Sequence, residues 1–516
     1  MEFEDLLKGV GDFGKFQKLL VILLLIPASA LNILYDYMFM LTTPDHWCYV
    51  PQLANLSKHV QTQLIRPLTI EQGLPSYDKC HMYDINYDLV NSTTVFPFNN
   101  SSDIKTRECD NGWVYDESVF GATATTQFNL VCNNAHYVSV LMSLGAIGLV
   151  ITTPIFSAVT DCFSVCRFIG GSLLVIYYQI PFILAVEFVG TDYRSKTSSL
   201  SAIGYSLGGC ILPGVVYLTS DWVWLAVFQF VATLPFLLCW RLVPESASWL
   251  ITQKRYSEAY EVLTKVAKVN GQPVPKDLMI QIQKVGAKQE ESKKTEQKDS
   301  TYDLIRIPEL RKQLLILIVL FVANVVAYAG LALNSLNFHG NELMNFFLLA
   351  LADMPALFLG WYLIEGRLGR RWTNTLSLMI CGFSLCIPVL LDPSQKTLIT
   401  ILSLLGKGGT AASYMIIFQQ SAEIFPTTLR SEGMGICSTI SSGVAIVVPH
   451  ISYLGRYGLW IPMFIMGFGC LIAGIASSFL PETLNENLPQ NSAESKKFGK
   501  NKSYFCLANV SLKTHL

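Results

Sequence analysis

Long apolar segments are the feature of this sequence that most restricts what the chain can fold into. A helix needs about 20 consecutive apolar residues to cross the hydrocarbon core of a bilayer, and only helices and closed barrels satisfy their backbone hydrogen bonds there. Eleven segments of this kind can be marked in the sequence: Leu19–Leu41, His136–Thr160, Phe163–Val189, Leu200–Leu218, Trp222–Trp240, Leu314–Leu333, Leu343–Ile364, Thr373–Leu391, Leu398–Phe418, Met434–Tyr453 and Leu459–Leu480. The pattern predicts an all-α polytopic membrane protein.

The overall composition points the same way. Of the 516 residues, 51% are apolar and 15% are charged, whereas soluble domains carry about 25% charged residues. The formal net charge is −1, so charge gives no reason to expect a nucleic acid as partner. The expected surroundings are a lipid bilayer, and neither a cofactor nor a metal ion is expected.

The first of two long polar loops, residues 42–135, carries the marks of an extracytoplasmic segment. It contains four of the 13 cysteines and four glycosylation sequons: Cys48, Cys80, Cys109 and Cys132, and Asn55, Asn91, Asn99 and Asn100. These cysteines show no C-x-x-C spacing, so a zinc site is not expected. In an oxidising compartment the four cysteines are candidates for two disulfides, and the sequence leaves three connectivities open.

The second long loop, residues 241–312, is rich in lysine and has neither a sequon nor a cysteine. Positive residues favour the cytoplasmic side, and "QKVGAKQEESKKTEQKDS" is typical of a solvated, partly disordered linker. The predicted organisation is therefore a cytoplasmic N-terminus, an N-terminal helical bundle that includes the glycosylated loop, a cytoplasmic linker, a C-terminal bundle and a cytoplasmic tail, at residues 1–18, 19–240, 241–312, 313–480 and 481–516.

The number of crossings between the two loops conflicts with their predicted sides. An odd number of spans must join an outside loop to an inside one, but four apolar segments lie between residues 136 and 241. A span is therefore absent or unusual in this part of the chain.

Seven short motifs occur in an order that is typical of one family. They are "MEFEDLLKGVGDFGKFQ", "TPDHWC", "EFVGTDYR", "PESASWL", "NFFLLALADMPA", "SAEIFPTTLRSEGMG" and "LPET". With them, the chain resembles the major facilitator superfamily over nearly its whole length, and within it the organic cation, anion and carnitine transporters of solute carrier family 22. "DKCHMYDINY" is most similar to insect organic cation transporter proteins. The resemblance implies two six-helix bundles, twelve helices in all, with both termini inside.

The basic turn "EGRLGRR", residues 365–371, is similar to the loop between the family's eighth and ninth helices. The resemblance implies a related turn between the second and third. Asp161 fits its acidic position, but the following "CFSVCRFIGG" looks like the start of the family's fourth helix, with Arg167 in its motif. The comparison implies that the basic turn and the third helix are absent, which leaves about 11 transmembrane helices instead of 12.

Asp353 is the candidate binding residue that stands out without any comparison. It lies in the middle of "FFLLALADMPALFLGW", and an ionisable residue inside a membrane span is a functional-site hypothesis. The resemblance assigns the acidic residue of this helix to cation translocation. Lys407, in "LLGKGGTAA", is a possible partner, so a structural or gating ion pair is the alternative to substrate contact.

Aromatic side chains are the second element of an expected organic-ion site, because ring faces attract cations. The resemblance places Tyr328 in the cation pocket and Tyr178 at an aromatic position of the fourth family helix, with Gln179 beside it. Packing between helices is the alternative for both tyrosines. Ser442 stands where cation carriers tend to have Asp and anion carriers Arg, which is compatible with a zwitterion such as a carnitine-like or betaine-like solute.

The resemblance also assigns charged residues to the cytoplasmic faces of the two bundles, where they form gate ion pairs. They are Glu365, Arg367, Arg370, Arg371, Glu423 and Arg430 in the second half, and Glu245, Asp161 and Arg167 in the first. Solvated loop charges are the alternative interpretation. Trp47, near the end of the first apolar segment, is expected to be an interfacial aromatic anchor.

The sequence thus predicts a carrier of small organic ions, organic cations or zwitterions, that works by alternating access. No nucleotide-binding loop, H-E-x-x-H or G-x-S-x-G motif lies in a loop that could hold an active site, so an enzyme is not expected. The alternative function, which follows from the absent third helix, is a transport-deficient truncated form or a regulatory membrane protein.

Overall fold

The computed structural model of the chain describes residues 3–30, 36–89, 105–144, 188–232, 244–295 and 302–484, together with 147 and 495, except for residues 12, 72–73, 190, 229, 339, 367, 393, 427–428 and 459. The chain divides into two compact units. Unit 1 comprises Met1–Leu34, Ser143–Pro213 and Phe228–Leu516, and unit 2 comprises Tyr35–Met142 and Gly214–Val227.

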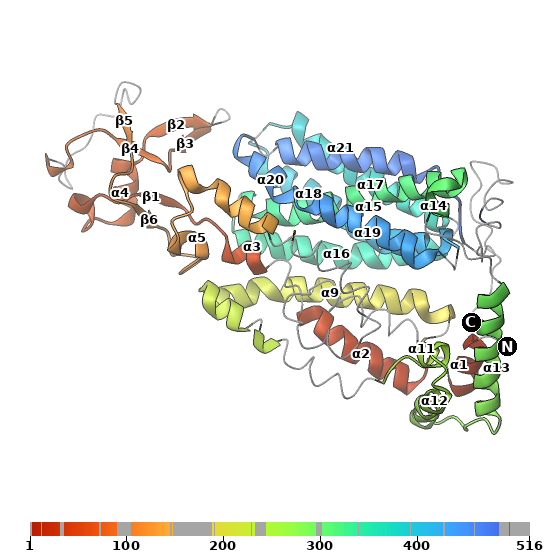
Figure 1. Cartoon of the computed structure of the whole chain (residues 1–516). Coiled ribbons are helices and arrows are strands. Elements are labelled where there is room, and N and C mark those ends of the chain that lie inside the picture. Colours follow the sequence, from red (N-terminus) through yellow and green to blue (C-terminus); the bar gives the residue numbers. More distant parts are fainter. Residues whose placement is uncertain are drawn as a thin grey trace. The chain divides into compact units, whose positions relative to one another are not determined.

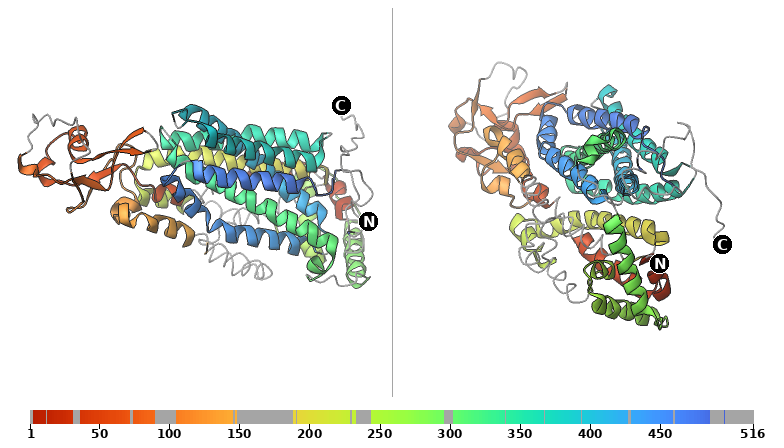
Figure 2. Two further views of the ribbon diagram at one scale, coloured as in Figure 1. Left: turned by 90° about the horizontal axis from the view of Figure 1, so that it is seen from above. Right: turned by 45° about the vertical axis from the view of Figure 1, so that its right-hand side comes forward.

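Long apolar helices in unit 1 form a bundle that holds the candidate site. They are α15 (Pro308–Asn334), α16 (Glu342–Glu365), α17 (Gly369–Cys386), α18 (Lys396–Ile424), α19 (Arg430–Ala445), α20 (Val448–Tyr453) and α21 (Trp460–Ser477). Helix α17 packs against α18 and α21, and α15 packs against α18, α19 and α21 (Figure 1). The helices stay side by side in both views of Figure 2. Their shared core is built of residues such as Leu317, Phe321, Leu378 and Ile417.

Seven helices of the described residues are long and apolar enough to cross a membrane. They are Ser199–Thr219, within α9 (Thr191–Thr219), and Pro308–Asn334, Glu342–Glu365, Gly369–Leu390, Lys396–Ile424, Glu432–Arg456 and Trp460–Ser477. Each coincides with one of the eleven apolar segments marked in the sequence. The other four segments, which start at Leu19, His136, Phe163 and Trp222, fall wholly or partly outside the described residues.

Local sequence signals set the ends of these helices. Ile307 is extended at φ −84° and ψ 119°, as expected for a residue that precedes a proline, and α15 begins at Pro308. The side chain of Asn341 accepts a hydrogen bond from the backbone N–H of Met344 and caps α16. Pro355 lies inside α16, and such prolines are tolerated in membrane helices.

Three helices occupy much of the Lys-rich linker: α11 (Ala247–Thr252), α12 (Tyr256–Asn270) and α13 (Leu278–Thr295). Helix α12 is amphipathic, buries Leu263 and Val266, and ends at Gly271, whose φ is 70°. Its apolar face joins a core with Leu6 and Leu7 of α1 (Phe3–Val10). The interpretation of residues 283–295 as a partly disordered linker is therefore wrong, because they belong to α13. The short α14 (Asp303–Arg306) follows.

The amide of Asn270 joins these linker helices to the start of α2 (Lys15–Ala30). Its Oδ1 accepts the backbone N–H of Phe16 at 2.9 Å, and its Nδ2 donates to the carbonyl of Gly11 at 3.0 Å and to Oε1 of the fully buried Gln17 at 3.0 Å. Gly11 has φ +90°, a conformation that favours glycine. The motif "GVGDFGKFQ" is thus held by several partly buried hydrogen bonds.

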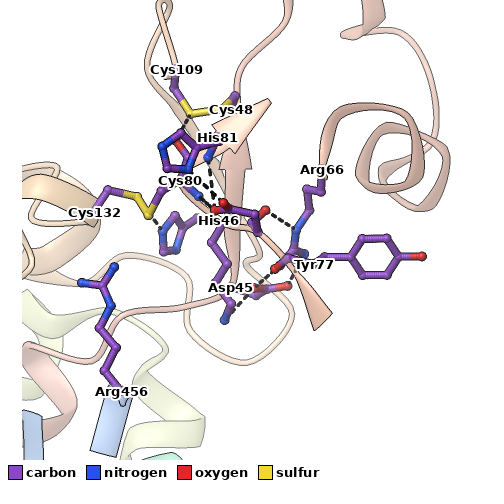
Figure 3. The surroundings of a disulfide bond; sticks show 12 residues. Asp45, His46, Cys48, Arg66, Tyr77, Cys80, His81, Cys109, Cys132 and Arg456 are labelled. Atoms are coloured by element: carbon purple, nitrogen blue, oxygen red, sulfur yellow. Dashed lines mark hydrogen bonds and ion pairs between the residues drawn. A yellow bond between two sulfur atoms is a disulfide. The ribbon is translucent and has the colours of Figure 1, made fainter. Parts of the chain in front are cut away.

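Unit 2 contains small helices and three two-stranded antiparallel sheets. The helices are α3 (Asp36–Met40), α4 (Lys58–Ile65) and α5 (Ala124–Gln127), and the pairs are β1 (His46–Cys48) with β6 (Trp113–Tyr115), β2 (Leu68–Glu71) with β3 (Leu74–Tyr77), and β4 (His81–Tyr83) with β5 (Thr106–Glu108). Disulfides join Cys48 to Cys109 and Cys80 to Cys132 (Figure 3). This is one of the three connectivities that the sequence leaves open.

Ion pairs and aromatic packing support this small unit. Asp45 binds Arg66 at 2.9 Å (Figure 3), and it also binds Lys79 at 3.0 Å. Burial raises the pKa of Asp45, but the charges and hydrogen bonds of Lys79 and Arg66 outweigh burial and hold the pKa below its usual value. Trp47 is only 2% exposed, packs in the unit's core and donates to Gln61. The prediction that Trp47 is an interfacial anchor is therefore wrong.

Candidate functional site

Three helices of the bundle bring together the residues that the sequence singles out inside apolar segments. Asp353 comes from the middle of α16, Tyr328 from α15 and Lys407 from α18. Asp353 is 2% exposed and Lys407 is 3% exposed. Two opposite charges are thus buried within a set of helices long enough to span a membrane, where each isolated charge is costly.

Tyr328 lies between the two charges. Its hydroxyl donates a hydrogen bond to Oδ2 of Asp353 at 2.9 Å. Its carbonyl accepts one from Nζ of Lys407 at 3.3 Å, and the same Nζ lies 2.9 Å from the centroid of its ring. No direct ion pair joins the described Asp353 and Lys407. The tyrosine therefore connects a carboxylate and an ammonium that do not touch.

One oxygen of the Asp353 carboxylate has no partner among the described residues. Oδ1 is buried and accepts no hydrogen bond from the described residues. Buried polar atoms in native proteins are nearly always hydrogen-bonded, and an exception calls for an explanation. The vacant oxygen is a position where a positively charged group could bind.

Small residues of α18 allow the close helix approach that this geometry needs. A Cβ on Gly408 would lie 3.1 Å from the Cβ of Ala356 in α16, and a Cβ on Gly409 would lie 2.7 Å from the carbonyl of Ser377 in α17. Small residues at such positions let helix backbones approach each other. The string "GKGGTAA" therefore places Lys407 on a helix that packs tightly against α16 and α17.

Aromatic rings continue from Tyr328 along α15 and α18. The ring centroids of Tyr328 and Tyr414 are 6.0 Å apart, those of Tyr414 and Phe418 are 5.2 Å apart, and those of Phe418 and Phe321 are 5.1 Å apart. Sequence reasoning missed Tyr414. The signal was its spacing, because it follows Lys407 by seven residues, about two helical turns, and so shares its face of α18.

A buried chain of neutral polar side chains lies beside this aromatic row. Nδ2 of Asn324 donates to Oγ of Ser413 at 3.0 Å, Ser413 donates to Oδ1 of Asn374 at 2.6 Å, and Asn374 donates to Oε1 of Gln420 at 3.3 Å. All four residues are fully buried. The chain ties α15, α17 and α18 together, and the sequence analysis did not identify it.

A second charged cluster lies at the C-terminal end of α18, and we call it the Glu423 cluster. It consists of Glu423, Arg370, Gln419, Glu482 and Thr483. Nε of Arg370 lies 2.7 Å from Oε2 of Glu423, which also accepts from the hydroxyl of Thr483 at 2.5 Å. Oε1 of Glu423 accepts from Nε2 of Gln419 at 3.4 Å. Both oxygens of this carboxylate therefore have partners.

Glu482 caps α17, the helix that begins within "EGRLGRR". Its two carboxylate oxygens accept the backbone N–H groups of Arg370 at 3.0 Å and Arg371 at 3.1 Å. Gly369, the first residue of α17, has φ +65°, and a Cβ there would lie 2.5 Å from the Glu482 carboxyl. The glycine is thus required both by its backbone conformation and by the approach of Glu482. Glu482 and Thr483 belong to the motif "LPET", and the sequence alone predicts no role for either residue.

Other charged residues of the predicted gate set have different partners. Oε1 of the exposed Glu365 accepts from the indole of Trp361 at 3.0 Å, the guanidinium of Arg371 lies 5.0 Å from the Trp372 ring, and Glu245 binds Arg255 at 3.3 Å. Two predicted residues lie on α19 and are half-buried: Arg430, its first residue, and Ser442.

Several predicted site residues fall outside the described part of the chain. They are Tyr178 and Gln179 of the predicted binding site, Asp161, Arg167 and Arg367 of the predicted gate, and the sequons at Asn91, Asn99 and Asn100. The predicted absence of a third family helix falls in the same interval, between Asp161 and Arg167. Asn55, the remaining sequon of this loop, is exposed just before α4.

The fold defines a polytopic helical membrane protein, and comparisons with known proteins give its class and family. The sequence profile described as "Sugar (and other) transporter" matches residues 123–493. The inward-open xylose transporter XylE from E. coli covers 72% of this chain, and the chain covers 91% of it, with a TM-score of 0.51 and 15% identity. This likeness shows a shared fold.

Curated relatives match over nearly the whole chain. The "Carcinine transporter" of Drosophila melanogaster is 31% identical, with 97% of this chain and 80% of the relative covered. The "Beta-alanine transporter" of the same organism is 30% identical, with 96% and 89% covered. The human "Organic cation/carnitine transporter 2" is 30% identical, with 95% and 93% covered.

The chain belongs to the Sugar (and other) transporter family of the major facilitator superfamily. The resemblance to the organic cation and carnitine transporters of solute carrier family 22 is thereby confirmed. The chain is a multi-pass membrane transporter and not an enzyme, and transporters of this kind are typically found at the plasma membrane.

Proposed function

We propose that this chain moves a small organic ion with a positively charged nitrogen across the membrane, and that Asp353 receives this charge. The observation that carries the proposal is the vacant Oδ1 of a carboxylate that is 2% exposed on a spanning helix. The rings of Tyr328 and Tyr414 supply faces that attract a cation. The relatives support the same substrate class, because carcinine, β-alanine and carnitine all carry a basic or quaternary nitrogen.

The protein works by alternating access in this proposal, with two bundles that move around a site near the membrane midplane. The Glu423 cluster is the gate of the second bundle, because its ion pair joins the start of α17 to the end of α18. Ser442 adds no charge to the site, which leaves room for a zwitterionic substrate. Gradients or the membrane potential supply the driving force.

The orientation proposed for the chain places unit 2 outside the cell. Its two disulfides are typical of an oxidising compartment. Asn55 is exposed and would accept a glycan there. The linker helices α11, α12 and α13 then lie in the cytoplasm.

Uptake by cells that express the full chain tests the proposal. The probes are radiolabelled tetraethylammonium, carnitine and β-alanine, and surface biotinylation measures the amount of protein at the plasma membrane. The wild-type chain is expected to take up at least one probe, and Asp353→Asn is expected to abolish that uptake at unchanged surface level. Asp353→Glu, which keeps the charge, is expected to retain part of it.

Two outcomes would contradict the proposal. Uptake that is unaffected by Asp353→Asn would remove this carboxylate from the site. A wild-type chain that reaches the surface but moves none of the probes would favour the alternative, a transport-deficient truncated form or a regulatory membrane protein.

A further inference from the structure

The position of Lys407 is unusual for a lysine that balances a carboxylate. Its ammonium lies over the ring of Tyr328, 2.9 Å from the centroid, and donates to the carbonyl of the same residue at 3.3 Å. It does not form an ion pair with Asp353, although both residues are almost fully buried. The lysine therefore occupies the ring face that a bound organic cation would use.

The neighbouring carboxylate is arranged for a further partner. Asp353 accepts one hydrogen bond, at Oδ2 from the Tyr328 hydroxyl, while Oδ1 accepts none from the described residues. A ligand that bears an ammonium could bind Oδ1 and the Tyr328 ring together only if the Lys407 ammonium moves off the ring. A lysine can make this movement, because its charge is a compact group on a flexible four-carbon stem.

We propose that Lys407 is an internal substitute for the substrate's positive group and determines selectivity for zwitterions over simple cations. The substrate ammonium displaces the lysine from Tyr328, and the released Lys407 then pairs with a carboxylate of the same substrate. This inference rests on the proposed function of Asp353 as the cation-binding residue.

The charge balance of the site favours this substrate class. Asp353 and Lys407 carry opposite charges, so the buried pair is neutral when the site is empty. A simple cation adds an uncompensated positive charge to a region of low dielectric constant, where such a charge is strongly unfavourable. A zwitterion keeps the total at zero and gives both protein charges a direct partner.

The described residues around Lys407 favour an ammonium that can reach either the Tyr328 ring or the carboxylate of the substrate. Gly406, Gly408 and Gly409 flank it and let α18 pack closely against α17 and against α16, the helix that carries Asp353. Tyr414, whose ring centroid is 6.0 Å from that of Tyr328, supplies a second ring face on α18 itself. The substrate ammonium and the lysine thus have separate aromatic surfaces near one carboxylate.

The experiment compares two probes in three proteins. β-Alanine carries an amine and a carboxylate, and tetraethylammonium carries only the cation. In Lys407→Gln, β-alanine uptake at equal surface level is expected to fall at least about tenfold, while tetraethylammonium uptake is kept or increases because its competitor is gone. Lys407→Arg, which keeps a positive charge, is expected to preserve the wild-type preference for β-alanine.

A test on the wild-type protein covers the case that Lys407→Gln does not fold. β-Alanine and its amide differ only in the carboxylate, so competition by each against labelled β-alanine isolates that group. The amide is expected to compete at least about tenfold less well. Equal competition by acid and amide overturns the inference, as does an equal loss of both probes in Lys407→Gln at normal surface level.

Asp353→Asn separates this inference from the proposed function. If Asp353→Asn loses both probes while Lys407→Gln leaves their ratio unchanged, the carboxylate binds the cation and only the role of Lys407 is wrong. If Asp353→Asn retains both probes, the proposed function itself fails.

Discussion

Two carboxylates in the same helical bundle differ in how many of their oxygens have a partner. Glu423, at the end of α18, has partners on both oxygens: Arg370, Thr483 and Gln419. Asp353, in the middle of α16, has one partner on one oxygen among the residues that the structure describes. The first arrangement is complete without any ligand, whereas the second is incomplete.

In the function proposed above, this difference separates a carboxylate that stabilises one state of the protein from a carboxylate that binds the substrate. Breaking a buried ion pair by removing one partner is costly, because the other charge is left uncompensated. A carboxylate that already lacks a direct ion-pair partner loses less when it is neutralised. Stability measurements on the two carboxylates should therefore differ even though both residues are buried.

The largest expected effect follows from Glu423→Gln. The change keeps the shape of the side chain but leaves Arg370, whose side chain is 13% exposed, without its ion pair. We expect the free energy of unfolding to fall by about 3 kcal/mol, measured by thermal unfolding of the purified protein in detergent. Glu365→Gln is the matched control, because Glu365 is exposed and its carboxylate accepts only from Trp361 among the contacts described.

An unchanged free energy of unfolding in Glu423→Gln would contradict the interpretation of Glu423 as a carboxylate that stabilises the fold. It would mean that the 2.7 Å contact between Glu423 and Arg370 contributes nothing net, as is common for solvent-exposed pairs.

Thr483→Val should have the next largest effect. Thr483 is 2% exposed, and its hydroxyl donates a hydrogen bond to Oε2 of Glu423. Hydrogen bonds to charged groups contribute about 1.5 kcal/mol or more, so we expect a loss of about that size in the same unfolding assay. In the Glu423→Gln background the loss should shrink, because the acceptor is no longer charged, and a double-mutant cycle measures this coupling.

The spans and the most informative residue of this protein could be predicted because their signals are local. Each apolar segment is visible within about 20 residues, and seven of them coincide with observed helices. Asp353 is visible for the same reason, since a single charge interrupts an apolar run. Its interaction with Tyr328 and Lys407 is not local, because the three residues lie on three helices.

Contacts between distant residues account for what the sequence did not reveal. Glu482 caps α17 from 111 residues away, and the four loop cysteines had three pairings that spacing could not distinguish. Helix α13 was missed because its polar, Lys-rich composition is typical of solvated segments. Its burial of Ile282 and Val285 against α1 and α12 depends on the fold.

Glu482→Ala should have a smaller effect than either change at Glu423 or Thr483. It removes the acceptor of two backbone N–H groups at the start of α17, and loss of a helix cap costs about 1 kcal/mol. Hydrogen exchange of Arg370 and Arg371 is the direct measurement, and their amides should exchange faster while those in the middle of α17 do not change. Protection that is unaltered at the helix start would show that water replaces the carboxylate without cost.

The smallest expected change in stability belongs to the double variant Asp353→Asn/Lys407→Gln, which removes both buried charges and so leaves neither of them uncompensated. The asparagine carbonyl can still accept the Tyr328 hydroxyl, and the glutamine amide can still donate to the Tyr328 carbonyl. We therefore expect the free energy of unfolding to change by less than about 1 kcal/mol, well below the change for Glu423→Gln. A loss as large as that for Glu423→Gln would mean that Asp353 and Lys407 stabilise the fold as an ion pair. Asp353 and Glu423 would then both be structural carboxylates.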